Sequence, residues 1–156
     1  MAKVSIESDG DRHVVVKRHF VASPEAVYRA HTDAALIQRW MLGPEGWTMP
    51  VCVCDPRPGG EIRYEWSNGQ GATIKLTGSF IELVPFSRLM HVERMHMPDP
   101  LPENHVTTTF TAEGTGTLVT VRMTLPDARV RAAVLASGME HGLEASYGRL
   151  ENMLER

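Results

Sequence analysis

Apolar and polar residues alternate along most of the chain between Trp47 and Leu125. Such alternation is typical of β-strands, because successive side chains point to opposite faces of a sheet. Short segments rich in glycine, proline, asparagine and aspartate interrupt the pattern, and these residues favour turns. The pattern predicts six strands, at 47–55, 60–67, 72–84, 88–97, 105–112 and 117–125. Since only a few residues connect them, we expect an antiparallel meander.

The segment before this region predicts one strand and two short helices. Residues 12–20 are rich in β-branched residues, and an Asp-Gly turn can pair them with residues 3–7. Ser23 followed by Pro24 is a helix start signal, which predicts a helix over 23–32. Asp33 caps a second predicted helix over 33–40.

The last segment, from Asp127 to Glu155, has a helical period. Its larger apolar residues recur every three or four positions, which predicts one long amphipathic helix. Gly138 and Gly142 share a face of this helix. We therefore expect the helix to lie tightly against the sheet there, or to leave space for a bound molecule.

Two adjacent glycines in "DPRPGGEIRYEW" (55–66) raise the question of a phosphate-binding loop. Such a loop needs a helix directly after its glycines, because the amide groups of the helix N-terminus bind the anion. Gly59 and Gly60 are followed instead by an alternating run, which predicts a strand. The glycines are therefore interpreted as a turn between strands.

Composition and charge narrow the class of protein. With 156 residues, 42% of them hydrophobic, the chain is expected to form a single domain over 1–156. A formal charge of −3 gives no reason to expect a nucleic-acid partner. No apolar stretch is long enough to span a membrane, and the N-terminus is polar, so a cytoplasmic location is expected.

Candidate chemistry is sparse. Cys52 and Cys54 share one face of a predicted strand and are interpreted as ordinary thiols. The motif "HVERMH" places His91 and Glu93 on one face and His96 on the other, so the three cannot bind one metal ion locally. We predict no catalytic residue, metal or cofactor, although His91 with Glu93 is an alternative acid–base pair if it lies in a cavity.

The chain resembles the START-like, helix-grip (SRPBCC) superfamily, and within it the proteins related to the C-terminal domain of the activator of Hsp90 ATPase. The residues that carry the resemblance are "RHFVASPEAVYRAHTDAALIQRW", "DPRPGGEIRYEW", Gly78 with "FIELVPFSRL", "GTLVTVRM" and "SGMEHGLEASYGRLENML". The resemblance implies an α+β fold in which a curved antiparallel sheet wraps around a long C-terminal helix. One departure is Leu143, where the family usually has an aromatic residue.

The resemblance also implies a cavity between the sheet and the last helix, which holds apolar molecules in many relatives. Strand parity and helix spacing identify the residues that could face this cavity. The expected ligand-binding residues are Trp40, Trp47, Tyr64, Trp66, Val121, Met123, Met139, Leu143 and Tyr147. For any one of them, a plain role in core packing is the favoured alternative.

Three functional classes follow from the resemblance. The first is a non-enzymatic binder of a small hydrophobic molecule, which we favour. The second is a module that contacts a chaperone or another protein; it ranks lower because that role of the name-giving relative involves a second domain. The third is an enzyme of the polyketide cyclase type. A homodimer formed through an edge strand is a further alternative that the sequence leaves open.

Overall fold

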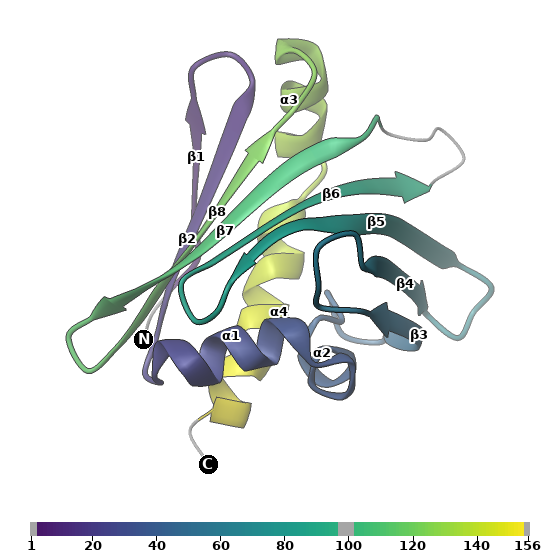
Figure 1. Cartoon of the computed structure of the whole chain (residues 1–156). Helices are drawn as coiled ribbons and strands as arrows, with labels where there is room; N and C mark the ends of the chain where they lie inside the picture. Colours follow the sequence, from purple (N-terminus) through teal and green to yellow (C-terminus); the bar gives the residue numbers. More distant parts are fainter. Residues whose placement is uncertain (1–2, 97–101, 155–156) are drawn as a thin grey trace.

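The computed structural model describes residues 3–96 and 102–154. They form one eight-stranded antiparallel sheet whose strand order is β1-β2-β8-β7-β6-β5-β4-β3 (Figure 1). The strands are β1 (Ser5–Asp9), β2 (His13–Phe20), β3 (Thr48–Cys54), β4 (Glu61–Ser67), β5 (Thr73–Val84), β6 (Arg88–His96), β7 (Asn104–Glu113) and β8 (Gly116–Thr124). The fold is α+β, as the sequence predicts, and it is consistent with the helix-grip fold.

The period-two pattern locates the strands well. All six predicted strands from 47 onward are present, and their ends differ from the prediction by at most one residue. Residue 97, the predicted end of one strand, lies outside the described residues. The N-terminal hairpin is also confirmed, because β1 pairs antiparallel with β2 around Gly10. Strand β2 then pairs with β8, so the first hairpin joins the meander through its last strand.

Two short helices follow β2 and begin where their capping residues predict. Helix α1 (Pro24–Thr32) starts after Ser23, whose hydroxyl accepts a hydrogen bond from the Ala26 amide. Helix α2 (Ala34–Trp40) starts after Asp33, whose carboxylate accepts a hydrogen bond from the Ala35 amide at 2.9 Å. Each cap satisfies an amide that the first turn of a helix leaves without a partner.

The C-terminal segment is two helices, and the prediction of one continuous helix over 127–155 is wrong. Helix α3 (Ala128–Leu135) has Ala136 as its C-cap residue, and helix α4 (Met139–Leu154) begins after Gly138. Gly138 has φ +78°, a left-handed conformation that ends α-helices and favours glycine. The apolar period runs through this break, and for that reason it predicts a single helix.

Gly59 and Gly60 form the turn between β3 and β4, as the sequence predicts. Gly59 has φ +80°, and a Cβ atom on Gly60 would lie 1.9 Å from the Asp55 carbonyl oxygen. Strand β4 begins directly after them. The two glycines therefore allow a tight connection that a residue with a side chain could not make.

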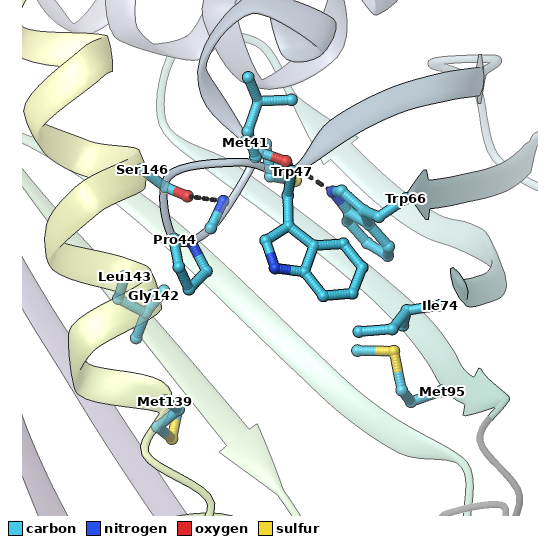
Figure 2. A pocket seen from close by; sticks show the side chains of 12 residues that line it. Met41, Pro44, Trp47, Trp66, Ile74, Met95, Met139, Gly142, Leu143 and Ser146 are labelled. Carbon is cyan, nitrogen blue, oxygen red and sulfur yellow. Dashed lines mark hydrogen bonds between the residues drawn. The ribbon is translucent and has the colours of Figure 1, made fainter. Parts of the chain in front are cut away.

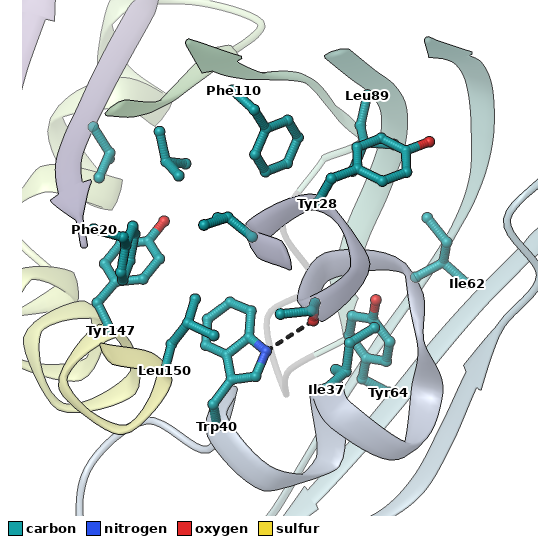
Figure 3. Close-up of a cluster of buried hydrophobic side chains, with 14 of the residues drawn as sticks. Phe20, Tyr28, Ile37, Trp40, Ile62, Tyr64, Leu89, Phe110, Tyr147 and Leu150 are labelled. Carbon is teal, nitrogen blue, oxygen red and sulfur yellow. Dashed lines mark hydrogen bonds between the residues drawn. The ribbon is translucent and has the colours of Figure 1, made fainter. Parts of the chain in front are cut away.

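Helix α4 lies across one face of the sheet, with α1 and α2 near its C-terminal end and α3 at its other end (Figure 1). Tyr147 and Leu150 of α4 pack into a cluster with Phe20, Trp40 and other buried side chains from the sheet and the short helices (Figure 3). The ring of Trp40 stacks on that of Tyr147, with centroids 5.9 Å apart. This cluster fixes the C-terminal half of α4 against the sheet.

An ion pair reinforces the same end of α4. Arg18 of β2 is 4% exposed, and its guanidinium lies 3.0 Å from the Glu151 carboxylate of α4. The other oxygen of Glu151 accepts a hydrogen bond from the Val21 amide at 3.2 Å. A buried charge needs such partners, so Arg18 and Glu151 hold each other in place. None of the helices in the described part of the chain is long and apolar enough to cross a membrane.

Candidate functional site

The N-terminal half of α4 is less tightly packed against the sheet than its C-terminal half, and three pockets lie along it. The loop pocket, of about 400 Å³, lies between α4, the loop after α2, and strands β4 to β6 (Figure 2). The sheet pocket, of about 200 Å³, lies over the centre of the sheet. The α3 pocket, of about 440 Å³, lies between α3 and the ends of β5 to β8.

The three pockets adjoin one another because they share lining residues. Leu143 and Trp66 line both the loop pocket and the sheet pocket. Met139 lines both the loop pocket and the α3 pocket. Glu93 and Met123 line both the sheet pocket and the α3 pocket. The pockets therefore form neighbouring compartments around residues 139–147.

Hydrogen bonds connect the loop that borders the loop pocket to α4 and to β4. The Gly43 amide donates a hydrogen bond to the Ser146 hydroxyl at 2.8 Å, and Arg149 donates one to the Gly43 carbonyl at 2.7 Å. The Trp66 indole N–H donates to the Met41 carbonyl at 2.8 Å (Figure 2). Because these bonds satisfy the polar atoms, the indole presents its apolar ring to the pocket.

All nine residues that the sequence predicts for the site line one of these pockets, but they differ in exposure. Trp40, Tyr64 and Tyr147 border the sheet pocket and are 2%, 7% and 4% exposed, so they belong chiefly to the packed core. The three pockets together are called the hollow between the sheet and α4. The other six predicted residues are partly exposed and line this hollow: Trp47, Trp66, Val121, Met123, Met139 and Leu143. Three of the nine predicted residues thus belong chiefly to the packed core, and the other six keep exposed surface.

The sheet pocket contains a hydrogen-bonded pair of titratable side chains. His91 and Glu93 both lie on β6 and face the pocket, with side chains 17% and 23% exposed. The His91 Nε2 atom lies 2.7 Å from the Glu93 Oε1 atom. His96 instead contacts the Thr77 hydroxyl, so the sequence-based separation of the two histidines is correct. In the described segments, no group of three or more histidine, cysteine, aspartate or glutamate side chains could hold a metal ion.

His31 is a second polar residue at the sheet pocket. Its Nδ1–H donates a hydrogen bond to the Val27 carbonyl at 2.8 Å, and its ring packs between Trp40 and Phe110. Burial lowers the pKa of His31 to about 4, and the hydrogen bond to Val27 opposes this shift only in part. His31 is therefore neutral at pH 7.

The two cysteines are ordinary thiols by their surroundings. Cys54 donates a hydrogen bond to the Thr32 carbonyl at 3.4 Å, and neither cysteine forms a disulfide. Burial raises the pKa of Cys52 to about 11 and that of Cys54 to about 12. Since the thiolate is the reactive form, both are poor nucleophiles at neutral pH.

Sequence reasoning missed several lining residues. Met95 and Ile74 lie on the inner faces of β6 and β5, Met41 lies in the loop after α2, and Ser146 of α4 accepts a hydrogen bond from that loop. The sequence alone leaves open which face of residues 88–97 lines a cavity. In the structure the inner face of β6 carries Leu89, His91, Glu93 and Met95. The apolar residues at both ends of this row are the signal that would have placed the His91–Glu93 pair inward.

Comparisons with known proteins agree with this architecture. The family model described as "Activator of Hsp90 ATPase homolog 1-like protein" matches residues 21–155. A crystal structure of a protein from Rhodobacter sphaeroides is 33% identical, with a TM-score of 0.92 and 98% of each chain covered. Protein CV1439 from Chromobacterium violaceum is 25% identical, with a TM-score of 0.77, and the match covers 92% of this chain and 98% of that one.

Protein Ms6760 from Mycobacterium smegmatis shares the fold at 20% identity, with a TM-score of 0.85 and 97% and 96% of the two chains covered. A comparison with curated proteins found no match. The family model alone covers most of the chain, and the sheet and helices have the arrangement that the helix-grip superfamily implies. The chain therefore belongs to the Activator of Hsp90 ATPase homolog 1-like family.

Proposed function

We propose that this protein binds a small hydrophobic molecule in the hollow between the sheet and α4. The observation that carries this proposal is the set of three adjoining pockets with largely apolar walls. Their individual volumes, about 200 to 440 Å³, overlap the range of small-molecule sites, roughly 300 to 1,000 Å³. Membership of a family with apolar ligands in many relatives supports the same function.

The composition of the walls also supports binding of varied apolar shapes. Met41, Met95, Met123 and Met139 all line the hollow. Methionine is unbranched and flexible, so it adapts to the outline of a bound molecule. The indole rings of Trp47 and Trp66 add flat apolar surface at the loop pocket.

A substitution that fills the hollow tests the proposal. Leu143 lines both the loop pocket and the sheet pocket, so Leu143→Trp places a larger side chain at their junction. With the neutral dye N-phenyl-1-naphthylamine as probe, we expect a binding affinity about tenfold weaker in Leu143→Trp than in the wild type, because ring and probe compete for one space.

Leu135→Trp is the matched control, because Leu135 is 38% exposed on α3 and lines none of the three pockets. It should bind the dye as the wild type does. Circular dichroism and thermal unfolding establish that both variants are folded. Equal dye affinity in the wild type and in a folded Leu143→Trp contradicts a site in this hollow.

Acid–base chemistry on a bound molecule is the second candidate function, and one observation favours it. The His91–Glu93 pair, joined at 2.7 Å, faces a largely apolar pocket, where a histidine can accept or donate a proton. Liquid chromatography coupled to mass spectrometry, applied to a bound molecule before and after incubation, distinguishes the two functions, because it separates isomers as well as masses. If the protein is an enzyme, the wild type changes the mass or the isomer of that molecule and the His91→Phe variant does not. If the protein only binds the molecule, the wild type returns it unchanged.

A further inference from the structure

The charged groups at the hollow point to the chemistry of its ligand. Glu93 borders both the sheet pocket and the α3 pocket, and it is the one acidic residue among the described lining residues. No lysine or arginine is among them, and His31 is neutral at pH 7. The described lining of the hollow therefore contains one carboxylate and no lysine or arginine that could bind an anionic head group.

His91 occupies one oxygen of this carboxylate and leaves the other oxygen free. A carboxylate only accepts hydrogen bonds, so the proton between the two groups lies on His91 Nε2, which donates to Glu93 Oε1 at 2.7 Å. No residue of the described segments donates a hydrogen bond to Oε2. His91 is thus a positioning residue, and Oε2 is an acceptor at the junction of two compartments.

Asn104 places a second unpaired acceptor beside the first. It is the direct partner of Glu93 in the register between β6 and β7, so the two side chains are neighbours on one face of the sheet. Its amide oxygen is buried, and among the described residues it has no hydrogen-bond donor. Buried acceptors in proteins are normally paired, so this corner lacks a donor that a bound molecule could supply.

We propose that the ligand is a neutral apolar molecule with a single hydroxyl or N–H group, and that this group donates a hydrogen bond to Glu93. This inference rests on the proposed binding function and narrows it to a ligand class. The apolar skeleton occupies the compartments along Leu143 and Met139, and the donor group reaches Oε2. A fatty acid or another carboxylate is disfavoured, because it brings a second negative charge beside Glu93 with no lysine or arginine among the described lining residues.

Three probes with one two-ring skeleton test the inference: naphthalene, 2-naphthol and 2-naphthoate. Affinities are measured at pH 7 by titrating the labelled protein and following its amide chemical shifts. We expect 2-naphthol to bind about tenfold more tightly than naphthalene, because a hydrogen bond to a charged acceptor is a strong one. We expect 2-naphthoate to bind more weakly than naphthalene.

Substitutions at Glu93 test whether the differences in affinity among the three probes depend on its carboxylate. Glu93→Met, which keeps the length but removes the acceptor, should abolish the advantage of 2-naphthol over naphthalene. Glu93→Gln, which keeps the shape but removes the charge, should strengthen 2-naphthoate binding. Glu65→Met is the matched control, because Glu65 pairs with a basic residue two positions away, Arg63, at 2.6 Å and lines none of the three pockets.

The outcomes separate this inference from the function on which it rests. Equal affinities of 2-naphthol and 2-naphthoate for the wild type overturn the inference, and so does an undiminished 2-naphthol preference in Glu93→Met. If Glu93→Met does not fold, the inference is tested by the affinities of the three probes for the wild type and by the affinity of 2-naphthoate for Glu93→Gln. If none of these probes binds, and N-phenyl-1-naphthylamine does not bind either, the proposed function itself is contradicted.

Discussion

At the scale of single residues, His31 shows how the hollow acts on the groups around it. Its Nδ1–H is bonded to the Val27 carbonyl, and aromatic rings flank it on two sides. A protonated imidazole here would lose most of its hydration. The fold therefore favours the neutral form, which keeps a positive charge out of the sheet pocket.

This burial predicts a pH dependence of stability. The pKa of His31 is about 4 in the folded protein against 6.5 for a free histidine, so between these values the unfolded chain binds more protons. The contribution of His31 is fully present above pH 6.5 and is lost as the pH falls towards 4. The slope in this window is at most about 1.4 kcal/mol per pH unit.

Urea unfolding of the wild type and of His31→Phe at pH 7 and pH 5 measures this effect. The phenyl ring retains the aromatic packing but cannot be protonated. We expect the free energy of unfolding to fall more between the two pH values in the wild type than in the variant. An identical fall in both proteins contradicts a buried, neutral His31.

The sequence correctly predicts which side chains of a single strand share a face of the sheet. Tyr64 and Trp66 share the inner face of β4, as their spacing predicts, and Val121 and Met123 share that of β8. The sequence does not indicate how much of each side chain remains exposed in the folded protein. Trp40 is buried in the core, where its indole N–H donates a hydrogen bond to the Ala30 carbonyl at 2.9 Å. This contact between α2 and α1 is not revealed by the spacing of residues in the sequence.

At the scale of elements, the break between α3 and α4 lets α3 border a pocket of its own at one end of the hollow. Helix α3 has no buried residue, whereas α4 buries Ser146, Tyr147 and Leu150. A continuous helix would keep one direction from 127 to 155, but the left-handed Gly138 lets α3 turn and border its own pocket. The apolar period alone predicted the two helices as one, since it carries no information about φ.

Two glycines of this region should respond in opposite ways to alanine. Gly138 has φ +78°, so Gly138→Ala should destabilise the fold by about 1 kcal/mol. Gly148 lies inside α4 with nothing within 4 Å of an added Cβ atom, so Gly148→Ala should stabilise it by about 0.5 to 1 kcal/mol. Urea unfolding at pH 7 measures both, and equal gains would indicate an unbroken helix.

At the scale of the whole molecule, one end of α4 is fixed and the other borders open space. The Arg18–Glu151 pair and the aromatic cluster fix the C-terminal half. Along the N-terminal half, partly exposed methionine and leucine side chains face the sheet across the three pockets. The resemblance to a family predicted this arrangement of sheet and helix, whereas the inward position of Glu93 became evident only from the structure.

Intermolecular nuclear Overhauser effects can show whether a small apolar molecule occupies the hollow beside α4. In the complex with N-phenyl-1-naphthylamine, we expect contacts from the probe to the Leu143 methyl groups and to the Trp66 ring. Contacts to the exposed side chain of Ile81 instead, with none to Leu143 or Trp66, would place the molecule outside the hollow and rule out binding there.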